Sequence, residues 1–135
     1  MKPFIKVCES KVLRRSVLVC CGTRQELKRI FLDPKTFRGL TVTKDQIEKD
    51  WRVIEESWDA ATEGYCALGF AIRLNGDIVI VLPEWDSRVF VHEAYHATRR
   101  VLEEIGSDDE ELGAYIIEWL FESVCWDGPK KRRKP

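Results

Sequence analysis

The chain has 135 residues, a length that suits one domain with a single hydrophobic core. Hydrophobic residues make up 44% of it and charged residues 33%, the composition of a globular protein, and the formal net charge of −1 argues against extensive contact with nucleic acid or anionic membrane. No apolar run approaches the ~20 residues of a membrane span, and the N-terminus lacks the features of a signal peptide. Five cysteines, an odd number without a Cys-x-x-Cys pair, suit a reducing compartment. We therefore expect a cytoplasmic protein.

The first part of the chain predicts two strands, over residues 4–7 and 12–21, because both stretches are rich in apolar and β-branched side chains. Thr23 and Glu26 have the spacing of a capping box, in which each side chain bonds the other residue's backbone N–H. This box predicts a short helix that ends at about residue 31.

A second capping box, from Thr43 to Gln46, opens a longer helix. Its buried face is marked by large apolar residues at helical spacing, namely Ile47, Trp51, Ile54 and Trp58. We interpret this aromatic stripe as core rather than as a platform for a ligand. The next unit is a β-hairpin of residues 66–74 and 77–82, because the Asn-Gly pair between them is the strongest signal for a two-residue type I′ turn.

The helix after the hairpin is predicted to run from about residue 87 to 105, with Asp86 as its N-cap and Gly106 as its C-cap. Most of its apolar side chains fill one broad arc of the helical wheel, whereas His92, Glu93 and His96 fall on the polar arc. The histidines are therefore predicted to face a cleft or solvent rather than the core.

The stretch His92-Glu93-Ala94-Tyr95-His96 contains the only two histidines of the chain. Positions four apart lie on one face of a helix, so both imidazoles can bind one Zn²⁺, and Glu93 can act as general base on a water that the metal activates. This H-E-x-x-H spacing is the signature of zinc-dependent hydrolases. We therefore predict a zinc metallopeptidase that hydrolyses peptide bonds in a protein or peptide substrate. The simpler alternative is a solvated pair of surface histidines beside an ordinary glutamate.

A catalytic zinc typically has a third protein ligand. The last helix, predicted over about residues 107–125 with a capping box at Ser107, carries a polar stripe that includes Glu111 and Glu118. The short connection predicts that this helix lies antiparallel to the histidine helix, and distance along the chain then brings Glu118 opposite His96. Glu111 comes within reach of the histidines if the connection between the two helices is kinked.

The histidine motif from His92 to His96, followed about fifteen residues later by Glu111-Leu-Gly-Ala-Tyr115, resembles small HExxH metallopeptidase-like proteins that phages and prophages encode. It is more distantly similar to the gluzincins. The resemblance covers roughly residues 65–122 and implies an α+β fold: a minimal zincin-like domain with a small antiparallel sheet. Its β-hairpin would pack on the HExxH helix, beside an antiparallel C-terminal helix.

The resemblance also implies a ligand set. The third gluzincin ligand is a glutamate in an E-x-x-[AS]-[ND]-like segment, and by position that glutamate is Glu111, with Ala114 as the small residue. Tyr115 departs from the usual Asn or Asp of that segment. In zincins an edge strand beside the site helix binds the substrate through main-chain hydrogen bonds, so one strand of the hairpin is expected to do so here.

We expect one zincin-like domain over residues 1–128 and a basic tail over residues 129–135, of which Lys130-Lys-Arg-Arg-Lys134 is the charged part. Two other functions remain open on this sequence. A catalytically inactive protein of zincin fold could bind a host protein, or the basic tail could contact nucleic acid; no contact with a membrane is expected.

Overall fold

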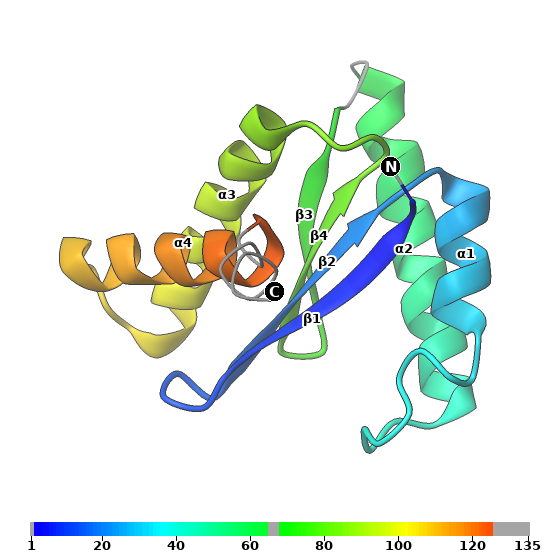
Figure 1. Cartoon of the computed structure of the whole chain (residues 1–135), viewed down its shortest axis with the longest axis horizontal. Coiled ribbons are helices and arrows are strands. Elements are labelled where there is room, and N and C mark those ends of the chain that lie inside the picture. Colours follow the sequence, from blue (N-terminus) through cyan, green and yellow to red (C-terminus); the bar gives the residue numbers. More distant parts are fainter. Residues whose placement is uncertain (1, 65–67, 126–135) are drawn as a thin grey trace, which may run out of the picture.

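The computed structural model of the protein describes residues 2–64 and 68–125. Eight elements follow one another along these residues (Figure 1), and their bounds are β1 (Phe4–Ser10), β2 (Arg15–Cys21), α1 (Arg24–Leu32), α2 (Lys44–Gly64), β3 (Phe70–Leu74), β4 (Asp77–Leu82), α3 (Ser87–Ile105) and α4 (Glu110–Cys125). The fold is therefore α+β, as predicted. The basic tail lies outside the described residues.

The four strands form one mixed sheet in the order β1-β2-β4-β3. β1 pairs with β2 and β3 pairs with β4 in antiparallel fashion, but β2 and β4 run parallel, with Val17 opposite Ile78 and Cys21 opposite Leu82. The expectation of an antiparallel sheet is therefore wrong at this pairing. Between β2 and β4 the chain passes through α1, α2 and β3, and a crossover of this length allows parallel neighbours.

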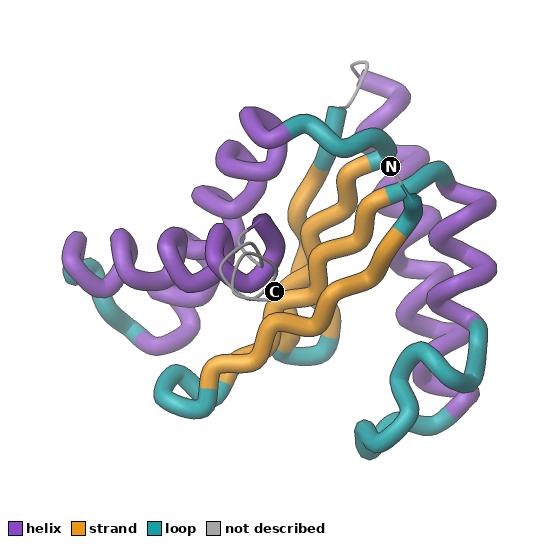
Figure 2. Tube along the Cα trace, in the orientation of Figure 1, coloured by secondary structure: helices purple, strands orange, loops and turns teal. Residues whose placement is uncertain are grey.

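Helices cover both faces of the sheet (Figures 1 and 2): α1 and α2 lie on one face, and α3 and α4 on the other. Each face has its own hydrophobic core, one built on Phe90, Ile116 and Leu120 and the other on Leu27 and Trp51. Residues 78–82 of β4 are fully buried because this central strand has a helical layer on each side.

Most element boundaries follow the local signals in the sequence. Residues 87–105 form α3 as predicted, with the Asp86 side chain accepting from the first-turn amides and with Gly106 in the left-handed conformation at φ 70°. Strand β2 begins three residues later than predicted, at Arg15, because the chain turns at Arg14 with φ 53°. The predicted start of the hairpin, at residues 66 and 67, lies outside the described residues.

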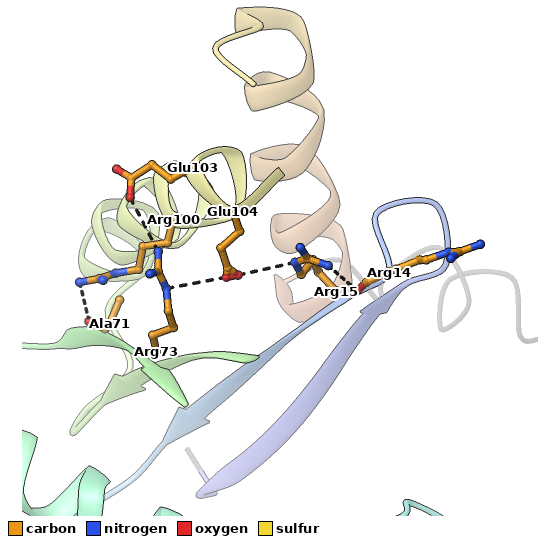
Figure 3. A network of polar contacts seen from close by, with 7 residues as sticks. All are labelled: Arg14, Arg15, Ala71, Arg73, Arg100, Glu103 and Glu104. Carbon is orange, nitrogen blue, oxygen red and sulfur yellow. Dashed lines mark hydrogen bonds and ion pairs between the residues drawn. The ribbon is translucent and has the colours of Figure 1, made fainter. Parts of the chain in front are cut away.

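Helix α4 differs from its prediction at two points. It begins at Glu110, and its cap is Asp109, whose carboxylate accepts from the amides of Glu111 and Leu112, so Ser107 is not the cap. α4 also crosses α3 instead of lying antiparallel along it (Figures 1 and 3). At the contact, a Cβ on Gly113 would lie 3.4 Å from Leu102 Cδ1, so the missing side chain lets the two helices approach closely.

In the part of the chain that the structure describes, no helix combines the length and the apolar composition needed to cross a bilayer.

Candidate metal centre

The two histidines lie on the exposed face of α3 and point toward a common position. Their Nε2 atoms are 3.1 Å apart, and their rings meet edge to face with centroids 4.7 Å apart. Both side chains are exposed, as the polar arc predicted. Because the two residues come from adjacent turns of one helix whose two ends are capped, the backbone holds their Cα atoms one turn apart on the same face. Two nitrogen atoms so placed suit two ligands of one metal ion.

Glu93 differs from the histidines because its side chain is buried. The residue is only 6% exposed, although the helical wheel put it on the polar arc. This position lies one residue further round the helix from His92, and it lines the same surface hollow as Leu68 and Gly69, the residues before β3. Burial raises the pKa of the Glu93 carboxyl, and the nearby charges of His92, His96 and Arg100 offset this rise in part. The result is a carboxylate with more affinity for a proton than an exposed glutamate has.

A surface hollow of about 520 Å³ opens beside the motif. Its lining combines apolar side chains, a charged rim and two motif residues: Leu68, Gly69, Val89, Asp86, Arg88, His92 and Glu93. The hollow therefore places the buried carboxylate and one histidine next to a concavity that could accept part of a ligand.

Gly69, just before β3, allows the chain to pass close to the start of α3. A Cβ at this position would lie 2.9 Å from Leu82 Cδ2 and 3.0 Å from Val89 Cγ1. A larger residue would force the side chains of Leu82 or Val89 to shift, so the glycine allows the chain before β3 to lie close to the start of α3.

The two candidates for a third ligand lie on α4, and both are exposed. Among residues 2–64 and 68–125, no group of three His, Cys, Asp or Glu side chains is close enough to hold a metal ion. The structure therefore brings His92 and His96 together but not Glu111 or Glu118 with them. The crossing of α4 over α3 accounts for this separation, because the α4 residues on either side of the contact at Gly113 diverge from α3.

A polar network ties the second half of α3 to the sheet (Figure 3). Arg73 of β3 lies 3.7 Å from the carboxylates of both Glu103 and Glu104, and Arg15 of β2 lies 3.5 Å from Glu104. One turn earlier on α3, Arg100 donates from Nη2 to the backbone oxygen of Ala71 at 3.5 Å. These contacts hold β3 beside the helix that carries the motif.

The contact of Arg100 with β3 was not predicted from the sequence. Arg100 follows His96 by four residues and Glu93 by seven, so helical spacing alone places it on the same stripe. Its contact with the edge strand could not be read from the sequence, because that contact depends on which strand lies beside α3.

A separate cavity of about 220 Å³ lies on the opposite face of the sheet, near the loop between α1 and α2. Its lining is mainly apolar and includes Phe31, Phe37 and Ile47. None of the predicted site residues lines it.

Comparisons of this chain with protein-family models, with curated proteins and with solved structures find no match.

Proposed function

We propose that this protein is a zinc-dependent metallopeptidase. The observation that carries the proposal is the pair of exposed imidazole nitrogens 3.1 Å apart, next to the buried carboxylate of Glu93. If the histidines were only a solvated pair on the surface, the burial of the glutamate between them would have no explanation. The edge position of β3 and the hollow beside the motif add a place for a peptide.

In this proposal His92 and His96 hold the metal, and Glu111 completes the set, with Glu118 as the alternative. Either glutamate would have to move toward the histidines, because neither lies with them among the described residues. When bound, zinc would polarise the scissile carbonyl and lower the pKa of its water.

Glu93 is the general base and acid in this proposal. Its raised pKa favours taking up the proton of the attacking water, and the same carboxyl group then delivers that proton to the leaving amine. The free edge of β3 would hold the substrate in extended form by main-chain hydrogen bonds.

The experiment that tests this function compares wild type with Glu93→Gln in the zinc-loaded full-length protein, with fluorescein-labelled casein as the probe. We expect Glu93→Gln to keep its zinc and to lose at least about 10²-fold in hydrolysis, the usual effect of removing a general base. Glu56→Gln is the matched control and should retain activity, because Glu56 is an exposed glutamate on α2, on the opposite face of the sheet. Hydrolysis by Glu93→Gln at the wild-type rate would contradict the proposal.

A second candidate is a catalytically inactive protein of zincin fold that binds another protein. It is favoured by the lack of a three-ligand group among the described residues. Zinc binding through the two histidines, with no hydrolysis that depends on Glu93, would support this second function.

A further inference from the structure

β3 is an edge strand of the sheet, and among the described strands it pairs only with β4. Asn75 and Gly76 both have positive φ, 46° and 87°, which makes the hairpin a two-residue turn of type I′. Leu74 and Asp77 are then the first hydrogen-bonded pair, and bonded and non-bonded pairs alternate from there.

This alternation determines which backbone N–H and C=O groups of β3 point away from β4. The backbone groups of Ile72 and Phe70 point to β4, so those of Ala71 and Arg73 point to the open edge. The contact from Arg100 to the oxygen of Ala71 agrees with this assignment, since that oxygen could not be reached if it were bonded to β4.

Arg100 lies where an added strand would place its own backbone. Paired strands lie about 4.8 Å apart, so the guanidinium at the Ala71 oxygen occupies the position of an incoming N–H group. A peptide that pairs with β3 must therefore displace Arg100. Figure 3 shows the arginine reaching the strand from α3.

Arg100 also differs from Arg15 and Arg73. Arg15 and Arg73 each have a carboxylate partner, whereas within the described residues no ion pair includes Arg100. Glu93 is near enough to feel the charge of Arg100 but forms no ion pair with it among the described residues. A half-buried guanidinium that loses its one backbone acceptor keeps unsatisfied N–H donors, which is unfavourable unless the incoming chain supplies an acceptor. A carboxylate is the best acceptor because it can take two parallel hydrogen bonds from the guanidinium.

The position of that carboxylate follows from the pairing. A residue opposite Ala71 projects its side chain to the same face of the sheet as Ala71 does. That face is the α3 side, because Arg73, two residues along the strand, reaches Glu103 and Glu104 of α3. An acidic side chain opposite Ala71 would therefore project toward the helix that carries Arg100.

We propose that Arg100 makes the β3 edge selective for extended peptides with an Asp or Glu at the position that pairs with Ala71. This inference rests on the proposed function, because it names the class of substrate for the same site. Without the acidic residue, Arg100 keeps the edge closed, as charged residues on sheet edges do in many proteins.

The test measures binding of fluorescein-labelled seven-residue peptides to the full-length Glu93→Gln protein by fluorescence anisotropy. The peptides share one extended host sequence of Thr, Val and Ala and carry Glu, Gln or Lys at each position in turn. We expect Glu at one position to bind at least about tenfold more tightly than Gln there, in line with a charge-assisted bidentate pair. Arg100→Gln should remove this difference, and Arg100→Glu should transfer the preference to Lys.

Arg99→Gln is the matched control, because Arg99 is exposed on the same helix and should leave the preference unchanged. The inference would be overturned if Arg99→Gln reduced the preference for Glu peptides as much as Arg100→Gln does. It would also be overturned if Arg100→Glu still preferred Glu peptides. If Arg100→Glu fails to fold by circular dichroism, Arg100→Gln and Arg100→Met decide the question.

The two proposals fail in different ways. If Arg100→Glu changes the peptide preference from Glu to Lys but the protein neither binds zinc nor hydrolyses casein, the selectivity of the β3 edge is supported and the peptidase is rejected. Zinc-dependent hydrolysis with no effect of Arg100 on peptide preference would keep the peptidase and reject the acidic selectivity.

Discussion

Zinc added to the metal-free protein should raise its melting temperature through the two histidines. Two nitrogen ligands of one tetrahedral zinc ion lie about 3.3 Å apart, close to the 3.1 Å between the Nε2 atoms of His92 and His96. The free protein therefore needs little rearrangement to supply these two ligands. A metal that binds only the folded state stabilises it by RT ln(1 + [Zn]/Kd).

The size of the shift distinguishes two ligands from three. At about 100 µM zinc, a site with a Kd of about 1 µM would gain about 2.7 kcal/mol, whereas a weak two-histidine site with a Kd of about 100 µM would gain about 0.4 kcal/mol. For a chain of 135 residues, each kcal/mol corresponds to about 4 °C in Tm. A complete site therefore predicts a rise of about 10 °C and the histidine pair alone about 2 °C.

The assay is thermal unfolding by circular dichroism of protein treated with EDTA, then desalted and supplemented with zinc. His92→Ala and His96→Ala should each lose the zinc response. Val91→Ala is the control, because Val91 is exposed on α3 beside the motif and should keep the full shift.

The same assay identifies the third ligand. Whichever of Glu111→Gln and Glu118→Gln removes a ligand should reduce the shift from about 10 °C to about 2 °C, and the other variant should leave it unchanged. An equal shift in wild type and His92→Ala would place the zinc elsewhere. No shift at all would refute the metal site.

Three other outcomes test the structure around the site. Asp86→Ala removes the carboxylate that caps α3, and urea unfolding should show a loss of about 1 kcal/mol; an unchanged midpoint would contradict the cap. Burial raises the pKa of the Cys20 thiol to about 12, so iodoacetamide at pH 8 should label this residue in the unfolded protein but not in the native one, and rapid native labelling would disprove its burial. Partial desolvation and the charges of Asp50 and Glu104 raise the pKa of Asp77, so the folded state binds this proton more tightly than the unfolded state does. Stability from this group is present below the unfolded pKa of about 3.9 and is lost as pH rises through the raised pKa. The unfolding free energy of Asp77→Asn should therefore exceed that of wild type by a larger margin at pH 7 than at pH 3.5. An equal margin at the two pH values would count against the raised pKa of Asp77.

Local signals predicted the helix that carries the motif. The Asp86 cap and Gly106 fixed both ends of α3, because each acts on backbone groups within one turn of itself. The Asn75-Gly76 pair likewise predicted the β3–β4 hairpin, since few residues other than glycine and asparagine tolerate positive φ. Spacing along α3 also placed His92 and His96 together on its exposed face.

Contacts between distant segments determine the strand order and the position of α4, which local signals did not predict. The parallel pairing of β2 with β4 depends on a crossover through three other elements, and nothing within either strand specifies its neighbour. The crossing of α4 over α3 depends on the close approach at Gly113, and it separates Glu111 and Glu118 from the histidines.

The histidine pair and the helix that presents it could be predicted from the sequence, because helical spacing and end caps act within a few residues. The burial of Glu93 and the contact of Arg100 with the edge of β3 could not, because they arise from packing between distant segments. Both depend on which strand packs against α3, and that packing depends on the whole sheet.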